Sequence, residues 1–263
     1  MSNMEFLNSN FFDTTTLASC TTGSTTVSYL FDRDRTTQFQ SSGDNDDATT
    51  TTFEVVFPSV KEIDRIVLQN INTKSFHLYY DAVTANRFSF TSAGTGTSAW
   101  SQNSATNLYL KLVSIKTISS LHIQMTATID ADEEKKVGEL WITSELLTLE
   151  HNPNSSQYKP KFDRKEYTHN MSDGGVSHYI VDKSFICNMK LAYQSDSMTS
   201  VLLDIYEDAD PFVFVPFPTG TSWEGRHIYE VNWVGDYDFL QPSKNDYSDY
   251  GWSGSLQLRE TPR

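Results

Sequence analysis

The side chains that most often carry catalysis are scattered along this sequence. There is no HExxH, GxSxG, P-loop or dinucleotide-binding pattern. Cys187 has no neighbouring base, and a cysteine within an apolar strand is usually inert. Six histidines occur without metal-ligand spacing: His77, His122, His151, His169, His178 and His227. The sequence therefore predicts no catalytic residues and no enzymatic activity.

One long polar connection, residues 82–107, contains side chains that could contact a carbohydrate. Sugar binding needs exposed aromatic faces and a few polar groups that fix orientation, and connections of this length are often functional. Arg87, Phe88, Trp100 and Tyr109 are the candidate ligand-binding residues. The alternative is that these aromatic rings pack a core, which is their commoner use.

Aromatic residues are also dense near the C-terminus, beyond what the inner face of one small sheet needs. Tyrosine and tryptophan are favoured at the centres of protein interfaces. The candidate interface residues are Trp223, Tyr229, Trp233, Tyr237 and Phe239. A large core is the alternative explanation.

The elements that position these residues are predicted to be strands. Apolar residues alternate with polar ones, as in Phe53, Val55 and Phe57, and this period of two indicates half-buried strands. We expect an all-β fold with strands at 53–57, 65–70, 76–80, 108–113, 121–128 and 138–143, and then at 177–181, 185–193, 201–206, 212–217, 227–233 and 255–258. Asp173-Gly174 predicts a hairpin turn.

The length of 263 residues suits two domains. Residues 150–157 are polar, contain a proline and lack periodicity, which favours a linker. We expect domains at 1–149 and 158–263, the first beginning with an N-terminal strand or arm.

The composition excludes several classes of function. A net charge of −14 without a basic cluster argues against nucleic-acid binding. Cys20 and Cys187 are too few for a disulfide framework. Neither a signal peptide nor an apolar run of membrane-spanning length is present, so we expect synthesis in the cytoplasm and no membrane insertion.

A turn rich in aspartate and threonine is formed by Asp32-Arg33-Asp34-Arg35-Thr36-Thr37-Gln38-Phe39. It resembles the DG(D/N)xxTxW turn of discoidin-type (coagulation-factor C, galactose-binding-like) domains, with Arg33 in place of glycine and Phe39 in place of tryptophan, and the resemblance covers residues 15–145. Residues 137–142, VGELWI, resemble the closing strand of these domains. The resemblance implies an N-terminal jelly-roll β-sandwich.

The same resemblance implies a structural calcium ion as the only cofactor, held by Asp32, Asp34, Thr37 and Glu139. Calcium binds six to eight hard oxygen ligands. Arg33 departs from the family because the turn can require a backbone conformation that glycine adopts without strain. The alternative is that the two aspartates order the turn by accepting backbone hydrogen bonds.

The C-terminal portion resembles domains of bacteriophage tail proteins, in stretches such as LLDIYEDADPFVFVPFP and GWSGSLQLRETP. This resemblance implies a second β-sandwich-like domain for assembly at a distal tail or tail tip. The expected function is that of an oligomeric virion protein, with other tail proteins as partners and a host-surface glycan as a further ligand. The alternative is a free or appended carbohydrate-binding protein.

Overall fold

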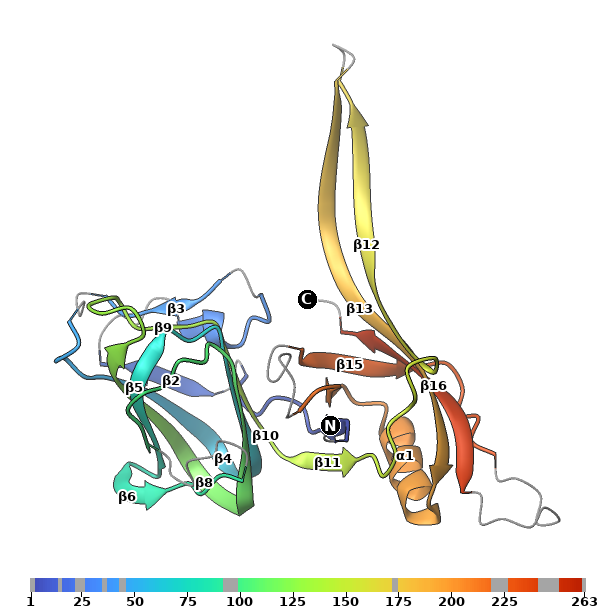
Figure 1. Ribbon diagram of the computed structural model, residues 1–263, viewed down its shortest axis with the longest axis horizontal. Helices are drawn as coiled ribbons and strands as arrows, with labels where there is room; N and C mark the ends of the chain where they lie inside the picture. Colours follow the sequence, from blue (N-terminus) through green and yellow to red (C-terminus); the bar gives the residue numbers. More distant parts are fainter. Residues whose placement is uncertain are drawn as a thin grey trace.

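The computed structural model shows two β-rich units side by side (Figure 1). It describes residues 3–13, 16–21, 27–34, 37–42, 46–91, 99–171, 175–218, 227–240 and 251–261. The first unit is a β-sandwich and the second is a seven-stranded sheet with one helix. The predicted all-β class, and the sandwich that the discoidin resemblance implies for the first unit, are confirmed.

Two long bent strands form the frame of the sandwich. Strand β4 (Thr51–Gln69) pairs antiparallel with β8 (Leu108–Thr128), and the register shifts between Val56 and Lys61 and again between Ile63 and Arg65. Such irregularities let a strand bend. Each bent strand covers two of the separate strands that the sequence predicted.

The other strands of this unit complete the curled sheet around one core. The sheet order is β10-β4-β8-β5-β6, with β2 paired to β4, β7 to β5, and β3 to β9 in a small separate sheet. Phenylalanines and aliphatic residues from both halves of β4 and β8 meet in one cluster. The bounds are β2 (Leu17–Cys20), η1 (Val27–Leu30), β3 (Phe39–Gln40), β5 (Thr73–Tyr80), β6 (Val83–Arg87), β7 (Ala99–Trp100), β9 (Lys136–Val137) and β10 (Glu139–Thr143).

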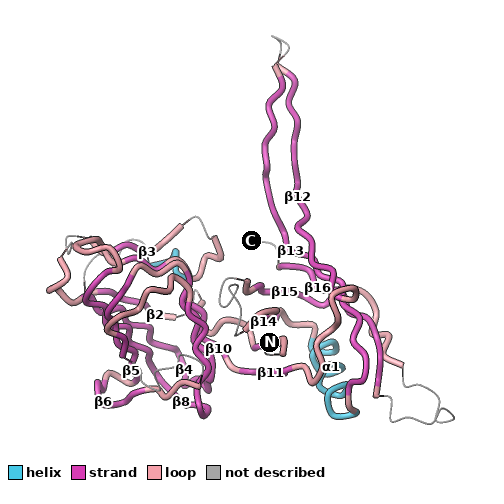
Figure 2. The backbone as a smooth tube through the Cα atoms, viewed as in Figure 1, coloured by secondary structure: helices cyan, strands magenta, loops and turns pink. Residues whose placement is uncertain are grey.

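In chain order, the sandwich is inserted between β1 (Glu5–Leu7) and β11 (Glu145–Thr148), which are both strands of the second sheet. Strand β1 pairs with β11 on one side and with β14 (Phe212–Val215) on the other. The expected ranges 1–149, 150–157 and 158–263 divide the chain differently, because β1 and β11 fall inside the first range. The chain thus leaves the second unit after β1, builds the sandwich and returns at β11 (Figure 2).

The second sheet has the order β11-β1-β14-β15-β16-β13-β12. Its remaining strands are β12 (Tyr158–Asn170), β13 (Val176–Gln194), β15 (Tyr229–Val234) and β16 (Trp252–Glu260). Strands β12 and β13 form the hairpin that Asp173-Gly174 predicts, although this turn lies outside the described residues. The hairpin extends far beyond the sheet (Figure 1).

The predicted strand at 201–206 is wrong, because this segment lies in helix α1 (Asp196–Asp208). Ser195 caps the helix by accepting a hydrogen bond from the Met198 amide at 3.2 Å. Met198, Leu202 and Ile205 are buried, and their spacing of three and four residues places them on one helical face. That face packs on the apolar side of the second sheet.

The two units are joined by a contact that we call the seam, between the outer face of β4, β8 and β10 and strands β1, β14 and β15. Val67, Tyr109 and Trp141 lie opposite one another on the sandwich side. They form one buried cluster with residues of the second unit: Leu7, Val213, Val215 and Ile228. Apolar runs such as Ile66-Val67-Leu68 are therefore buried on both faces of the strand.

The helix in the described part of the chain is too short and too polar to cross a lipid bilayer.

Candidate functional site

The Asp-rich turn is held together by its own hydrogen bonds. Asp32 Oδ1 accepts from the Asp34 amide at 2.8 Å, and Asp32 Oδ2 accepts from the Thr37 hydroxyl at 2.8 Å. The Thr37 oxygen also lies 2.8 Å from the Asp34 carbonyl oxygen. Asp32 therefore orders the turn, as the alternative interpretation of the sequence expected.

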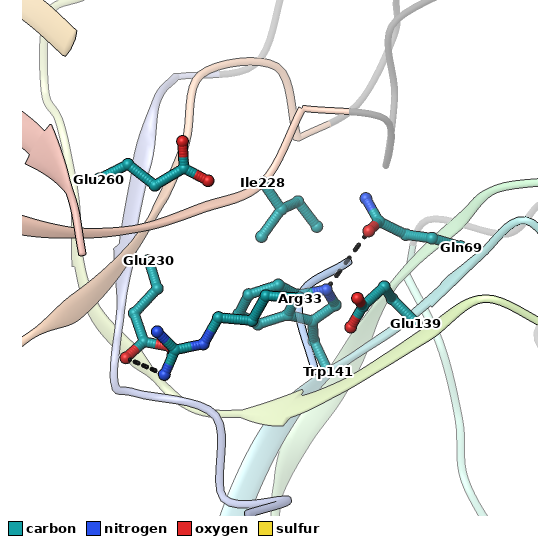
Figure 3. A pocket seen from close by; sticks show the side chains of 7 residues that line it. All are labelled: Arg33, Gln69, Glu139, Trp141, Ile228, Glu230 and Glu260. Atoms are coloured by element: carbon teal, nitrogen blue, oxygen red, sulfur yellow. Dashed lines mark hydrogen bonds and ion pairs between the residues drawn. The ribbon is translucent and has the colours of Figure 1, made fainter. Parts of the chain in front are cut away.

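The fourth predicted calcium ligand, Glu139, lies in the seam. It lines a small pocket there together with Arg33, Gln69, Trp141, Ile228, Glu230 and Glu260 (Figure 3). Among the residues that the structure describes, no three carboxylate, histidine or cysteine side chains gather as metal ligands. The positively charged side chain that lines this pocket is that of Arg33, and the calcium site that the resemblance implies stays a prediction.

Arg33 stands where the discoidin-type pattern has glycine, and it has a backbone conformation that glycine adopts without strain. Its φ angle is 62°, in the left-handed region where a side chain is strained. The same residue forms an ion pair across the seam, because its Nη2 lies 2.7 Å from each carboxylate oxygen of Glu230 (Figure 3). Burial raises the pKa of Glu230 and the Arg33 guanidinium opposes this shift. The departure from glycine thus provides a charged link to the second unit.

A second charged group in the seam surrounds the buried Arg65 of β4. Its guanidinium contacts Glu5 Oε2 at 2.8 Å, Asp64 Oδ2 at 3.0 Å and the carboxylate of Glu145. The Tyr109 hydroxyl donates a hydrogen bond to Glu5 Oε2 at 2.5 Å. Burial, and to a lesser extent the negative charge of Glu5, raises the pKa of Tyr109 well above its usual range. Strands β1, β4, β8 and β11 are therefore fixed to one another by charge-assisted bonds.

Three of the four predicted sugar-contact residues are buried. Phe88 is 1% exposed, Tyr109 1% and Trp100 8%, and Trp100 stacks on Phe76 with ring centroids 4.4 Å apart. The faces of these rings are not accessible to a sugar. Their burial agrees with the alternative interpretation, in which the aromatic rings pack a core. Arg87 is exposed at the end of β6.

Arg87 ends a row of polar side chains across five strands, which we call the polar row. Strand register places Ser19 opposite Glu54, Glu54 opposite His122, His122 opposite Tyr79, and Tyr79 opposite Arg87. These residues alternate with core residues, so they face away from the core. Of these five residues the sequence predicted only Arg87 as a contact residue, because long-range register is not readable from local pattern.

The centre of the polar row is a pair of rings held in place. His122 and Tyr79 stack at 4.7 Å with an interplanar angle of 9°. His122 Nε2 accepts from the Ala82 amide at 3.1 Å and lies 3.0 Å from the Ser120 hydroxyl oxygen. Burial lowers the pKa of His122, with Glu54 opposing, so the imidazole is neutral at pH 7 and its 3.6 Å approach to Glu54 is not an ion pair.

The two ends of the polar row are accessible. The Glu54 side chain is 38% exposed, and Ser19 and Arg87 are exposed. His122 and Tyr79, at 5% and 8% exposure, are nearly covered. The row therefore offers a carboxylate and a guanidinium on either side of a rigid aromatic centre.

Most of the predicted interface aromatics pack within the second unit. Tyr229 and Phe239 are buried, and Trp233 lies 5.6 Å from Tyr206 of α1 and 5.9 Å from Tyr237 between ring centroids. This arrangement follows the large-core alternative for these four residues, whereas Trp223 lies outside the described residues.

The remaining chemical candidate is the thiol of Cys187. It is fully buried, and burial raises its pKa to about 12. A thiol in this environment stays protonated at neutral pH and is a poor nucleophile.

The comparisons with known proteins found similarity in structure alone. No protein-family model and no curated protein sequence matches the chain. Among solved structures, it is similar to chitosan-binding module 1 from a Paenibacillus sp. IK-5 chitosanase/glucanase, at 13% identity over 51% of this chain and 97% of that one, with a TM-score of 0.38. It is also similar to the family 32 carbohydrate-binding module of Streptococcus pneumoniae EndoD, at 12% identity over 52% and 99%, with a TM-score of 0.37. A Clostridium perfringens module in complex with GalNAc-β-1,3-galactose matches at 11% identity over 49% and 94%, with a TM-score of 0.36.

Proposed function

We propose that this protein is a non-catalytic glycan-binding protein whose sandwich contacts sugar through the polar row. The observation that carries the proposal is the alignment of Ser19, Glu54, His122, Tyr79 and Arg87 across five adjacent strands. Sugar hydroxyls both donate and accept hydrogen bonds, so a surface that recognises them needs both kinds of partner.

The two charged side chains supply these partners. The Glu54 carboxylate accepts from sugar hydroxyls, and the Arg87 guanidinium donates to hydroxyl or ring oxygens. His122 and Tyr79 are too covered to stack on a sugar, so they act as positioning residues that keep the strands' outer side chains in line.

The spacing of the row indicates the size of the ligand. Glu54 and Arg87 are three strand spacings apart, which is about 14 Å at about 4.8 Å for each spacing. This separation suits a short oligosaccharide better than a single sugar.

Binding of the full-length chain to an array of oligosaccharides tests the proposal. Chitosan oligosaccharides and GalNAc-β-1,3-galactose, the sugars named for similar structures, belong among the probes. We expect Glu54→Gln and Arg87→Ala each to weaken binding at least about tenfold, a loss of about 1.4 kcal/mol. Glu62→Gln on the same strand and Lys116→Ala are the matched controls. Binding that neither row variant changes contradicts the proposal.

A second candidate function is assembly into a larger particle, and the extended β12–β13 hairpin favours it. An isolated two-stranded ribbon is at best marginally stable in water, so a hairpin that extends beyond its sheet favours a partner that covers it. We propose a bacteriophage tail as the assembly, with the protein located in the virion and in contact with other tail proteins. Neighbouring genes for a tail tube and a tape-measure protein are the expected result, whereas neighbouring glycoside hydrolase genes would favour a free or appended glycan-binding protein.

A further inference from the structure

The outer face of the second sheet lies opposite helix α1, and the sandwich covers one part of it at the seam. On β13 and β16 the side chains that point to this face are exposed, whereas their neighbours Cys187 and Leu258 lie in the core. The exposed part forms a groove of about 720 Å³, which we call the outer groove. This volume is typical of small-molecule sites. Its lining includes Lys159, Asn188, Lys190, Asp236, Asp238 and Gln257.

A row of side chains crosses the floor of the outer groove. Strand register places Val234 opposite Gln257, Gln257 opposite Asn188, and Asn188 opposite Lys159. The row spans four adjacent strands and is about 14 Å long, at about 4.8 Å for each of its three spacings. This length suits an elongated ligand better than a single ion.

The polar side chains on this floor are available for a ligand. Within the described part of the chain, the side chains of Asn188, Gln257, Lys159 and Lys190 form no hydrogen bond or ion pair. Each amide both donates and accepts hydrogen bonds, as a sugar hydroxyl does, and each lysine donates. The floor therefore matches a ligand that carries several hydroxyl groups.

Positive and negative charges lie on different sides of the outer groove. Lys159 and Lys190 belong to β12 and β13, whereas Asp236 and Asp238 follow β15. The Ser255 amide and hydroxyl donate hydrogen bonds to the two Asp238 oxygens at 2.7 and 2.6 Å, which hold this carboxylate in place. The lining has no net charge, but it has a cationic side and an anionic side.

The two lysines suit a single carboxylate. Lys190 is two residues beyond Asn188, the partner of Lys159, so the two lysines are diagonal neighbours about 7–8 Å apart. A carboxylate between them can place one oxygen about 2.8 Å from each ammonium group. A ligand charged along its whole length, such as a nucleic acid, would bring phosphates against Asp236 and Asp238. The ligand that fits carries its negative charge at one end.

We propose that the outer groove binds an oligosaccharide that carries a carboxylate at one end. The carboxylate lies between Lys159 and Lys190, and the hydroxyl groups bond to the amides of Asn188 and Gln257. At the neutral end of the sugar, Asp236 accepts hydrogen bonds from hydroxyl groups. No aromatic ring lines the groove among the described residues, so charge and hydrogen bonds hold the ligand instead of stacking. The groove lies in the second unit, and the inference does not rest on sugar binding at the polar row.

Calorimetric titration of the full-length chain with sialyllactose, which carries one terminal carboxylate, tests the outer groove. Lactose is the matched neutral probe. We expect a Kd below about 1 mM for sialyllactose and at least about tenfold weaker binding of lactose. Lys159→Met and Lys190→Met should each weaken the binding of sialyllactose at least about tenfold. Lys116→Met, which removes the same charge from the sandwich, should leave it unchanged.

Two further measurements separate this site from the polar row and from misfolding. Arg87→Ala should leave the affinity for sialyllactose unchanged, so failure of the polar row would not affect the outer groove. Both lysines are exposed, so their variants should keep the wild-type midpoint of urea unfolding. The proposal is overturned by no binding of sialyllactose at about 1 mM, by equal affinities for sialyllactose and lactose, or by lysine variants that bind as the wild-type protein does.

Discussion

Arg65 on β4 and Glu5 on β1 are sixty residues apart in sequence, yet Nε of the arginine lies 2.8 Å from Oε2 of the glutamate in the buried seam. One residue belongs to the sandwich and the other to the second sheet. This pair fixes the point at which the chain leaves the second unit after β1, and the contact of Arg65 with Glu145 fixes the point at which the chain returns at β11.

Arg65→Met should destabilise the protein by about 3–5 kcal/mol, because it leaves carboxylates buried without their cation. Urea unfolding followed by tryptophan fluorescence and circular dichroism measures the change. Glu62→Gln, an exposed carboxylate on the same strand, should change stability by less than about 0.5 kcal/mol. Equal effects of the two substitutions would contradict this account of the seam.

Two substitutions of Arg33 separate the effect of backbone strain on stability from the effect of the ion pair. Arg33→Gly and Arg33→Ala both remove the pair with Glu230, but only glycine adopts the φ of 62° without strain. We expect the alanine variant to be less stable than the glycine variant by about 1 kcal/mol, measured as a difference in unfolding free energy. Identical stabilities would show that the turn adjusts to the alanine side chain.

The pH dependence of the Arg33→Ala effect reports on Glu230. Burial raises the folded-state pKa of Glu230, so its contribution to stability is present below the unfolded pKa and is lost as pH rises through the folded pKa. Arg33 limits this loss by stabilising the carboxylate. Arg33→Ala should therefore lower the free energy of unfolding more at pH 7 than at pH 4. The expected difference is about 1–2 kcal/mol, a value between those of exposed and buried ion pairs. In a Glu230→Gln background the dependence on pH should disappear.

The turn at Asp32 should be sensitive to mutation but not to chelation. Asp32→Ala removes two hydrogen-bond acceptors and should cost about 1–2 kcal/mol. EDTA or added calcium should leave the melting temperature of the wild-type protein unchanged, because the described carboxylates do not gather as ligands. A rise in melting temperature on adding calcium, if Asp32→Ala abolishes it, would show that a calcium site exists at this turn.

Local pattern was enough to predict many of the strands, and the family resemblance pointed to the strained turn. Phe53, Val55 and Phe57 alternate and do face the core, and Arg33 does occupy a glycine-type conformation. The strand predicted at 201–206 failed because Leu202 and Ile205 were interpreted without the cap at Ser195.

Long-range pairing could not be predicted from local pattern. Tyr109 and Glu139 have residue types suited to sugar and metal, but the second unit covers them. The apolar run Ile66-Val67-Leu68 was the available signal for burial on both faces. The polar row depends on the register of five strands, which no local pattern specifies.

Calorimetric titration with the best oligosaccharide from the array is the most direct test of the proposed function. We expect a micromolar Kd for the full-length protein, a Kd at least about tenfold weaker for Arg87→Ala, and no change for Lys116→Ala. Equal affinities of Arg87→Ala and the wild-type protein would place any sugar site elsewhere, and no binding to any oligosaccharide tested would contradict the proposed function itself.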